Sequence, residues 1–158
     1  MPLTGEYEPS PRTRTRDQVE RYEATDGREA NTLAGTNWPV VIFTTRGRRT
    51  GKIRKMALMR VEHDGNYALI ASQGGAPEHP EWYLNLKADP QALMVQDGAE
   101  RFDAAVRELD GEERAIWWRR AVEAYPPYAE YQKRTRATDS STASRASRVI
   151  DDRAEWAP

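Results

Sequence analysis

The sequence predicts a mainly β, α+β domain in which a small antiparallel barrel has helices packed on its outside. Short β-branched or apolar runs alternate with turn signals, and two of these turns are the pairs Asp64-Gly65 and Asp97-Gly98. Such pairs favour hairpins, because glycine takes a positive φ without steric cost. Five short strands joined largely by hairpins make an antiparallel sheet, and the few helices left can cover its outer surface.

The chain has 158 residues, a hydrophobic fraction of 38% and a charged fraction of 31%. This length suits one domain, and the five Trp and seven Tyr can anchor its core. The polar residues concentrate at the two ends. We therefore expect residues 1–16 to be disordered, residues 17–135 to form the single domain, and residues 136–158 to be a polar tail.

The composition excludes several classes of protein and site. The chain has no cysteine, which removes disulfides, thiolate nucleophiles and iron–sulfur clusters. His63 and His79 have no ligand at metal spacing, so we expect no metal site. The formal net charge of −1 argues against a general nucleic-acid binder. No apolar run resembles a secretory signal or a membrane span, so we expect a cytoplasmic protein.

The first half of the chain gives one helix and three strands. Residues 17–30 predict a surface helix with a thin apolar stripe, which argues against firm insertion into a membrane. Whether this helix covers the active site or touches a membrane surface stays open. Residues 40–45 form a β-branched run typical of a buried strand, and residues 55–61 and 67–72 predict the first hairpin.

The second half gives two helices around another hairpin. Pro80 suits the first turn of a helix that ends near Ala88, and residues 92–96 and 101–109 predict the second hairpin. Asp110 is then a plausible N-cap, with Glu113 as its capping-box partner. One apolar face of that helix is formed by residues at helical spacing: Trp118, Ala121, Val122 and Tyr125.

The stretch TTRGRRTGKIRK contains no acid and a dense group of cations: Arg46, Arg48, Arg49, Lys52, Arg54 and Lys55. Arginine binds phosphate and carboxylate through two parallel hydrogen bonds, and lysine adds a point charge. A phosphorylated or polycarboxylate ligand therefore fits this basic loop. The alternative is a solvated hairpin that touches RNA or another anionic partner. Arg54 and Lys55 fall on opposite faces of the strand that follows, which favours a groove.

Two further segments could contribute to a binding site. The first lies at the same side of the predicted hairpin as the basic loop, and the second could line a pocket. SQGGAPEHPEWYLNL passes from a strand through a glycine pair to a helix N-terminus, where backbone N–H groups attract anions. An ordinary turn, with Trp82 and Leu86 filling the core, is the alternative. Tyr125, Tyr128 and Tyr131 follow at steps of three and could either line an aromatic pocket or pack in the core.

No nucleophile elbow, P-loop or dinucleotide fingerprint occurs in the chain. A bound cofactor would supply the missing reactivity. TTRGRRTGKIRKMAL and GNYALIASQGGAPEHPEWYLNLKADP resemble the deazaflavin-dependent nitroreductase family, the coenzyme F420-dependent reductases of actinobacteria. The likeness runs from Pro39 to Tyr131. It implies a split β-barrel like that of FMN-binding reductases, with FMN as the alternative cofactor, and the phosphate and glutamate tail of F420 would occupy the basic loop.

The resemblance also implies which residues form the site. Near the cofactor tail and along the groove it places Arg48, Arg49, Thr50, Arg54, Lys55, Met56, Ala57 and Met59. At the edge of the deazaflavin ring it places Ile70, Ala71, Ser72 and Gln73, and from the following helix Trp82, Tyr83 and Asn85. The tyrosines that would face the acceptor, and could supply a proton, are Tyr125, Tyr128 and Tyr131.

The implied reaction is hydride transfer from the reduced deazaflavin to an electron-poor small molecule such as a quinone, a nitroaromatic or an activated unsaturated lactone or ester. A carrier that binds the deazaflavin without efficient turnover and a module for RNA or an anionic partner are the alternatives. Split-barrel relatives commonly pair, so a homodimer is expected as well. The C-terminus departs from the family: residues 136–148 have no aliphatic side chain larger than Ala. Such a segment is not expected to form a buried strand, so our hypothesis is that a reading-frame change or a genuine replacement of the tail has removed the closing strand. A neighbouring sheet edge would then lie open.

Overall fold

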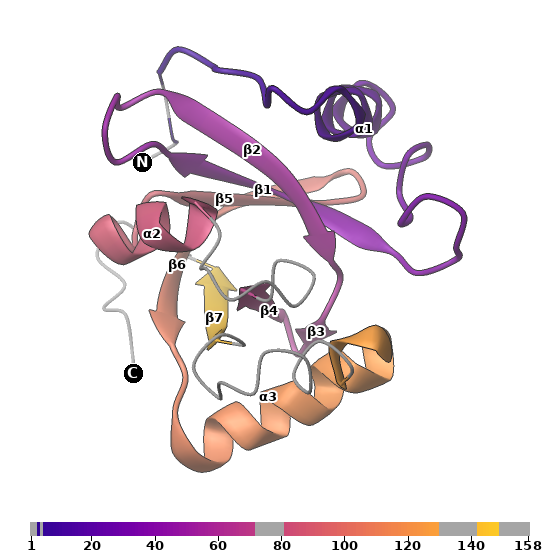
Figure 1. Cartoon of the computed structure of the whole chain (residues 1–158), viewed down its shortest axis with the longest axis vertical. Helices are drawn as coiled ribbons and strands as arrows, with labels where there is room; N and C mark the ends of the chain where they lie inside the picture. The colour runs from indigo at the N-terminus through magenta and orange to yellow at the C-terminus, as the bar shows by residue number, and fades with distance from the viewer. Residues whose placement is uncertain (1–2, 4, 72–80, 130–141, 149–158) are drawn as a thin grey trace.

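The computed structural model describes residues 3, 5–71, 81–129 and 142–148, the last of these segments by its backbone. In chain order the elements are α1 (Thr13–Ala24), β1 (Val40–Arg46), β2 (Ile53–Met59), β3 (Glu62–His63), β4 (Asn66–Ala71), α2 (Glu81–Ala88), β5 (Leu93–Asp97), β6 (Glu100–Glu108), α3 (Gly111–Ala124) and β7 (Thr142–Arg148). Figure 1 shows a curved sheet flanked by helices. The expected antiparallel, mixed α+β architecture is therefore confirmed.

The described strands form one seven-stranded sheet in the order β2-β1-β5-β6-β7-β4-β3, and its paired strands are antiparallel. The second predicted hairpin is confirmed as β5 and β6. The first is only partly right: β4 pairs across the Asp64-Gly65 turn with the short strand β3, whereas most of the residues expected to be its partner belong to β2, which pairs with β1. Asp64 and Gly65 have φ values of 53° and 80°, so both turn residues between β3 and β4 lie in the left-handed region that a type I′ turn requires. Gly98 has a φ of 67° at the turn between β5 and β6. Local turn chemistry thus fixed these two connections.

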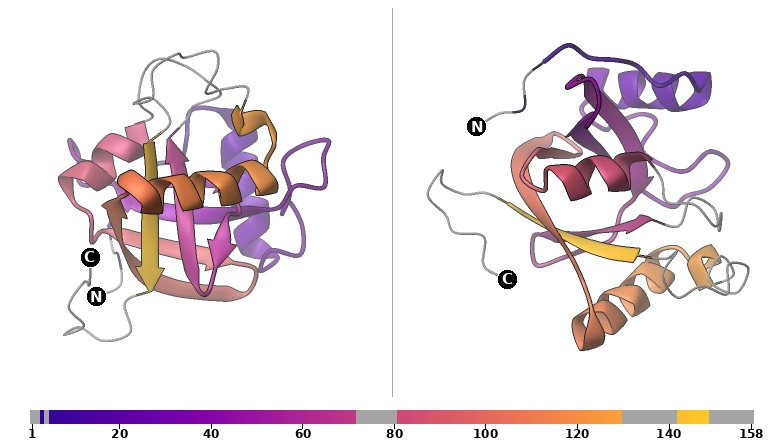
Figure 2. Two further views of the ribbon diagram at one scale, coloured as in Figure 1. Left: turned by 90° about the horizontal axis from the view of Figure 1, so that it is seen from below. Right: turned by 60° about the vertical axis from the view of Figure 1, so that its left-hand side comes forward.

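The sheet curls so that strands far apart in its order share one core. Val41 and Phe43 of β1 belong to the same buried cluster as Tyr67 and Leu69 of β4, although three strands separate β1 from β4 in the sheet. Figure 2 shows the two halves of the sheet lying across one another. Side chains of alternating residues therefore fill the interior, as in a small barrel.

Helices cover the outer surface of the curled sheet. α1 packs on β2, and α3 crosses β4 and β7 (Figure 2). Val19 and Tyr22 of α1, with Trp117 and Ala121 of α3, are buried in a second cluster that includes the outward-facing residues of β1 and β4. The predicted helix face, Trp118, Ala121, Val122 and Tyr125, packs on this cluster, and the buried Trp117 widens it by one residue. In the part of the chain that the structure describes, no helix is long and apolar enough to cross a membrane.

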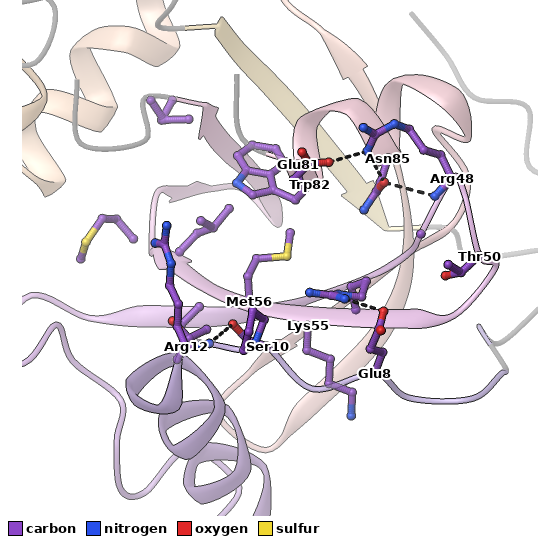
Figure 3. A pocket seen from close by; sticks show the side chains of 18 of the residues that line it. Glu8, Ser10, Arg12, Arg48, Thr50, Lys55, Met56, Glu81, Trp82 and Asn85 are labelled. Carbon is purple, nitrogen blue, oxygen red and sulfur yellow. Dashed lines mark hydrogen bonds and ion pairs between the residues drawn. The ribbon is translucent and has the colours of Figure 1, made fainter. Parts of the chain in front are cut away.

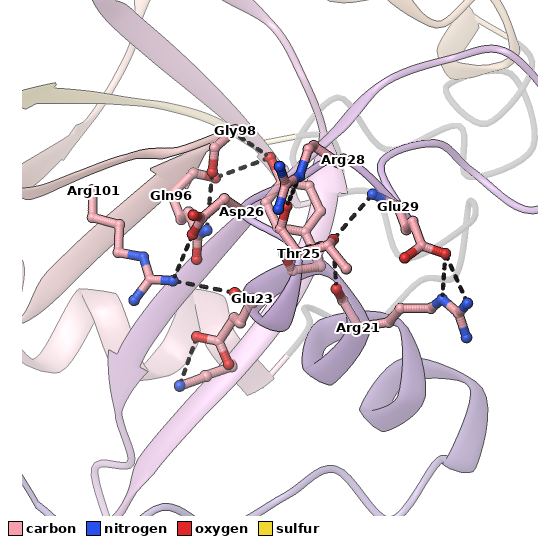
Figure 4. Close-up of polar contacts among 11 residues, drawn as sticks. Arg21, Glu23, Thr25, Asp26, Arg28, Glu29, Gln96, Gly98 and Arg101 are labelled. Carbon is pink, nitrogen blue, oxygen red and sulfur yellow. Dashed lines mark hydrogen bonds and ion pairs between the residues drawn. The ribbon is translucent and has the colours of Figure 1, made fainter.

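Polar contacts fasten α1 to the turn between β5 and β6 (Figure 4). The Gly98 N–H donates to the hydroxyl oxygen of Tyr22 at 2.8 Å, and that hydroxyl donates to the Gln96 carbonyl at 3.4 Å. Arg101 reaches Asp26 at 3.3 Å. Burial is the main cause that raises the pKa of Tyr22. The start of α1 at Thr13 places the helix four residues earlier than the sequence predicts.

The predicted capping box is wrong. Asp110 is the N-cap of α3 but makes no side-chain cap hydrogen bond, and Glu113 pairs with Arg107 at 2.8 Å instead of closing a capping box. Part of the segment before α1, which was expected to be disordered, forms backbone hydrogen bonds with Ile53 of β2 through Glu6 and Glu8. Tyr7 forms a parallel bridge with Ile53. The ion pair of Glu8 with Arg54 and the approach of Glu6 to Lys52 stabilise this segment beside β2 in place of apolar packing.

The expected loss of the closing strand is also wrong. β7 at Thr142–Arg148 pairs with β6 on one side and with β4 on the other, so it lies inside the sheet and closes the edge that was expected to be open. The sheet therefore extends past the predicted domain end at residue 135. A hydropathy pattern reports the burial of side chains, whereas this strand is held by backbone ladders on both sides. Small and polar residues do not prevent such pairing.

Candidate active site

A cavity of about 680 Å³ lies along β2, between the segment that precedes α1 and the helix α2 (Figure 3). A volume of this size suits a cofactor-sized ligand. Most of the site residues expected from the resemblance line it: Arg48, Arg49, Thr50, Arg54, Lys55, Met56, Ala57, Met59, Ile70, Trp82, Asn85, Tyr125 and Tyr128. Residues that lie more than 70 positions apart in the chain thus meet around one cavity.

The remaining predicted site residues have other placements. Tyr83 is buried outside the lining, where its hydroxyl donates a short hydrogen bond to Glu108 and Lys87 lies 5.8 Å from its ring centroid. Ser72, Gln73 and Tyr131 lie outside the described residues, and so does the glycine pair. Ala71 is the last residue of β4, and only its backbone is described.

The basic loop between β1 and β2 forms one end of the cavity. Arg48 Nη1 donates to Glu81 at 2.8 Å and to Asn85 Oδ1 at 3.0 Å, and the Arg48 N–H donates to the same Asn85 oxygen at 3.2 Å. Loop and α2 are therefore tied together. The Arg48 guanidinium holds the pKa of the Glu81 carboxyl below its usual range, so this ion pair is formed at neutral pH. Gly51, with a φ of 75°, allows the chain to turn back into β2.

Cations leave β2 toward both sides, as the alternation along the strand predicts. Arg54 Nη1 lies 2.6 Å from Glu8 Oε2, in the segment before α1. Lys55 Nζ lies 2.7 Å from Glu23 Oε2 on α1 and 4.8 Å from the centroid of the Tyr7 ring. Burial and the Glu23 carboxylate raise the pKa of Tyr7. The strand therefore presents charge on both faces, and acids from this chain already neutralise part of it.

The middle of the cavity is apolar. Met56, Ala57, Leu58 and Met59 line it from β2. Trp82 faces Met56 from α2 across the cavity (Figure 3). A flat aromatic ligand would find contact surfaces on two sides and little water between them.

Aromatic side chains form the end opposite the basic loop. Tyr125 and Tyr128 line the cavity and are 8% and 5% exposed. Their ring centroids are 4.8 Å apart in an edge-to-face arrangement, and Trp38 packs edge-on against Tyr125 at 5.1 Å. Both tyrosines belong to the core cluster, so the two sequence interpretations, pocket wall and core packing, hold together. Rigid rings at this end give the cavity a fixed shape.

The sequence reasoning missed one wall of the cavity. It is formed by five residues of the segment expected to be disordered, residues 1–16: Glu8, Ser10, Pro11, Arg12 and Thr15. Arg12 points into the cavity from the start of α1 (Figure 3). The available signal was charge complementarity: Glu6 and Glu8 are acids in a segment with almost no large aliphatic residue, and the basic loop has no acid of its own. Among the described residues, no three His, Asp or Glu side chains gather as a metal site requires.

Comparison with known proteins agrees with this geometry. Residues 14–139 match the F420H(2)-dependent quinone reductase family. The chain belongs to this family. An F420H(2)-dependent quinone reductase of Mycobacterium tuberculosis is 30% identical over 117 residues, which make up 72% of this chain and 77% of that protein. The chain is thus a member of a family of oxidoreductases that use coenzyme F420, as the resemblance implied.

Two solved structures extend the comparison. The structure of an F420-H2 dependent reductase, FDR-A, is 52% identical, covers 68% of this chain and 93% of its own, and has a TM-score of 0.64. A structure described as a domain-swapped dimer is 47% identical, covers 87% of this chain and 99% of its own, and has a TM-score of 0.67. The predicted fold class, cofactor and enzyme class are therefore confirmed.

The residues of the cavity fit this coenzyme. F420 joins a flat deazaflavin ring to an anionic phosphate and glutamate tail, and the cavity joins an apolar slot at Met56 and Trp82 to the cations Arg48, Arg49 and Arg54. Arg49 is exposed at the mouth and contributes to the field that lowers the pKa of Glu81. Net positive charge at one end and apolar surface beside it match the two parts of the molecule.

Proposed function

We propose that this chain reduces quinones with F420H2, and that the coenzyme and the acceptor share the cavity along β2. The observation that carries the proposal is one continuous cavity that joins the basic loop to the wall formed by Tyr125 and Tyr128. The mycobacterial relative named a quinone reductase supports the choice of acceptor. Nitroaromatics and activated lactones or esters belong to the same electron-poor class and serve as comparison substrates.

In this proposal the basic loop binds the anionic tail. Arg48 and Arg49 would contact phosphate or carboxylate oxygens, and Thr50 would add a hydroxyl donor. Asn85 fixes Arg48 from α2, so the guanidinium is oriented before the ligand arrives. Arg54 and Lys55 would add charge from the two faces of β2. Charges so placed also attract the anionic coenzyme from solution.

The apolar slot positions the ring. Met56, Met59 and Ile70 would cover its surface from the sheet, and Trp82 would cover it from α2. The bound reduced deazaflavin supplies the hydride. By excluding water, these side chains strengthen the electrostatic interactions at the reacting atoms and direct the hydride to the acceptor.

The tyrosine wall would receive the quinone. Reduction of a quinone to a quinol takes one hydride, which brings both electrons, and one proton. Tyr128 is the candidate donor of that proton, directly or through water, because its phenol is a hydrogen-bond donor at the cavity wall. Tyr125 packs against Tyr128 and positions it. Tyr131 stays a predicted member of this wall.

The test is acceptor-dependent oxidation of F420H2 by the purified chain. The reaction is monitored through the loss of the reduced coenzyme, and quinol is detected by chromatography. We expect stoichiometric quinol formation with a small benzoquinone or naphthoquinone and slower turnover with a nitroaromatic. Binding of F420 without turnover of any acceptor would contradict the proposal and favour the carrier alternative. Faster turnover of the nitroaromatic would contradict the choice of quinone.

The quaternary structure is a separate proposal. The solved relative described as a domain-swapped dimer supports pairing of two copies of this chain. Light scattering during gel filtration would test it, with twice the mass of 18.0 kDa expected for a homodimer. A monomer at micromolar concentration would contradict it.

A further inference from the structure

Residues 5–12 form an N-terminal strap along the cavity. The strap joins β2, which is at the end of the sheet order, through two backbone hydrogen bonds. The Glu8 N–H donates to the Ile53 carbonyl at 2.9 Å, and the Ile53 N–H donates to the Glu6 carbonyl at 2.7 Å. Parallel pairing of Tyr7 with Ile53 completes this contact. Backbone pairing thus holds the strap in a fixed register beside the basic loop.

That register places a carboxylate on a cavity cation. Glu8 Oε2 lies 2.6 Å from Arg54 Nη1, and Glu8 itself lines the cavity. Side chains of Glu8 and Arg54 are 41% and 35% exposed, so the pair sits at the cavity mouth and can exchange partners with solvent ions or ligands. Glu6 approaches Lys52 at the longer distance of 4.0 Å. Figure 3 shows Glu8 on the same side of the cavity as Thr50.

We propose that Glu8 is an internal competitor for the anionic tail of the coenzyme: it occupies the anion position at Arg54 in the free protein and has to release it when the tail binds. This inference rests on the proposed binding of the tail at the basic loop. A guanidinium that bonds a carboxylate at 2.6 Å cannot offer the same N–H to a phosphate or glutamate oxygen. A retained Glu8 charge also repels an anion placed beside it.

The exchange needs only the side chain to move. Both hydrogen bonds of the strap to β2 use backbone atoms, so Glu8 can turn away from Arg54 while the strap stays in place as a wall of the cavity. Removing the charge and keeping the shape therefore separates the two roles of the strap. Glu8→Gln does this, because glutamine has the same number of heavy atoms and keeps one carbonyl oxygen.

The experiment measures Kd for F420 by fluorescence titration with wild type, Glu8→Gln and Glu29→Gln. Glu29→Gln makes the same change in net charge outside the cavity, because the Glu29 carboxylate pairs with Arg21. We expect Glu8→Gln to bind F420 roughly two- to fivefold more tightly, as loss of a partly exposed competing ion pair implies. Glu29→Gln should match wild type. All three should bind the deazaflavin core that lacks phosphate and glutamates with equal affinity.

A double-mutant cycle with Arg54→Gln identifies the partner. We expect Arg54→Gln to weaken F420 binding, and Glu8→Gln to give a smaller gain in that background than in wild type, because only the relief of charge repulsion is left. Unchanged or weaker F420 binding by Glu8→Gln, with Arg54→Gln still weakened, would overturn the competitor role and leave the tail site standing. If Arg54→Gln and Arg48→Ala both bind F420 as wild type does, the tail site itself is wrong and the competitor role falls with it. Equal gains for F420 and for the bare core would also overturn it.

Discussion

Arg48→Ala is the substitution that most sharply tests the binding of the coenzyme tail. Its guanidinium side chain is 21% exposed and is aimed by Asn85 at 3.0 Å, so it is oriented for an anion at the mouth of the cavity. A hydrogen bond to a charged group contributes about 1.5–3 kcal/mol. Since Arg48 also bonds Glu81 in the free protein, tail binding partly exchanges one partner for another. We therefore expect the lower end of that range, a Kd for F420 about tenfold higher.

The assay is fluorescence titration of F420 at several salt concentrations. Wild-type affinity should fall more steeply with salt than that of Arg48→Ala, because the variant loses one screened charge contact. Arg21→Ala is the matched control, since Arg21 is an exposed arginine that pairs with Glu29 away from the cavity. The reasoning is refuted if Arg48→Ala binds F420 as wild type does, or if its loss is equally large for the deazaflavin core without phosphate and glutamates.

Three further predictions concern stability and turnover. Gly27→Ala should lower Tm by about 5–15 °C, because its Cβ would lie 2.7 Å from Gly98 Cα at a φ of +76°, whereas Gly35→Ala, at a φ of +77° with open space around it, should lower Tm by only a few degrees. Burial and the hydrogen bond to Asp97 raise the pKa of Tyr67. The folded state therefore holds this proton longer than the unfolded state, so stability should fall as pH rises above 10.0, and Tyr67→Phe should flatten that fall in urea midpoints. Tyr128→Phe should reduce the rate of quinone reduction at least about tenfold while the Kd for F420 stays the same.

Each of these has a result that contradicts it. Equal Tm losses for Gly27→Ala and Gly35→Ala would show that the approach to Gly98 has little effect. A Tyr67→Phe variant whose stability keeps the wild-type slope above pH 10.0 would assign that slope to other tyrosines, such as Tyr22. Full turnover by Tyr128→Phe with several quinones would assign proton donation to water.

Local chemistry made much of the fold predictable. The hairpin at Asp64-Gly65 follows from two residues that tolerate positive φ, and β1 follows from its β-branched run. Strand order could not be predicted in this way, because it depends on pairing between residues distant in the chain. β7 shows this most clearly: Thr142–Arg148 has no hydropathy signal of a strand, and its place between β6 and β4 is set by backbone partners on both sides.

The residues of the candidate site differ in the same way: those in contiguous motifs could be predicted from the sequence, and those brought in by the fold could not. Arg48, Arg54 and Trp82 were recognisable because their motifs are contiguous and chemically specific. Glu8 was not, since an acid in a polar segment is uninformative until the fold places it on Arg54. Tyr83 shows the opposite limit: its neighbour Trp82 faces the cavity, while Tyr83 is buried and bonds Glu108. Neighbouring residues of a helix point in different directions, so only one of two adjacent aromatic side chains faces the ligand.

A crystal structure of the chain with bound F420 tests the central claim most directly. We predict that the ring lies between Met56 and Trp82, that the phosphate and glutamates extend toward Arg48 and Arg49, and that Glu8 no longer contacts Arg54. Coenzyme bound away from β2, or bound with its ring at the basic loop and its tail toward Tyr128, would contradict the account.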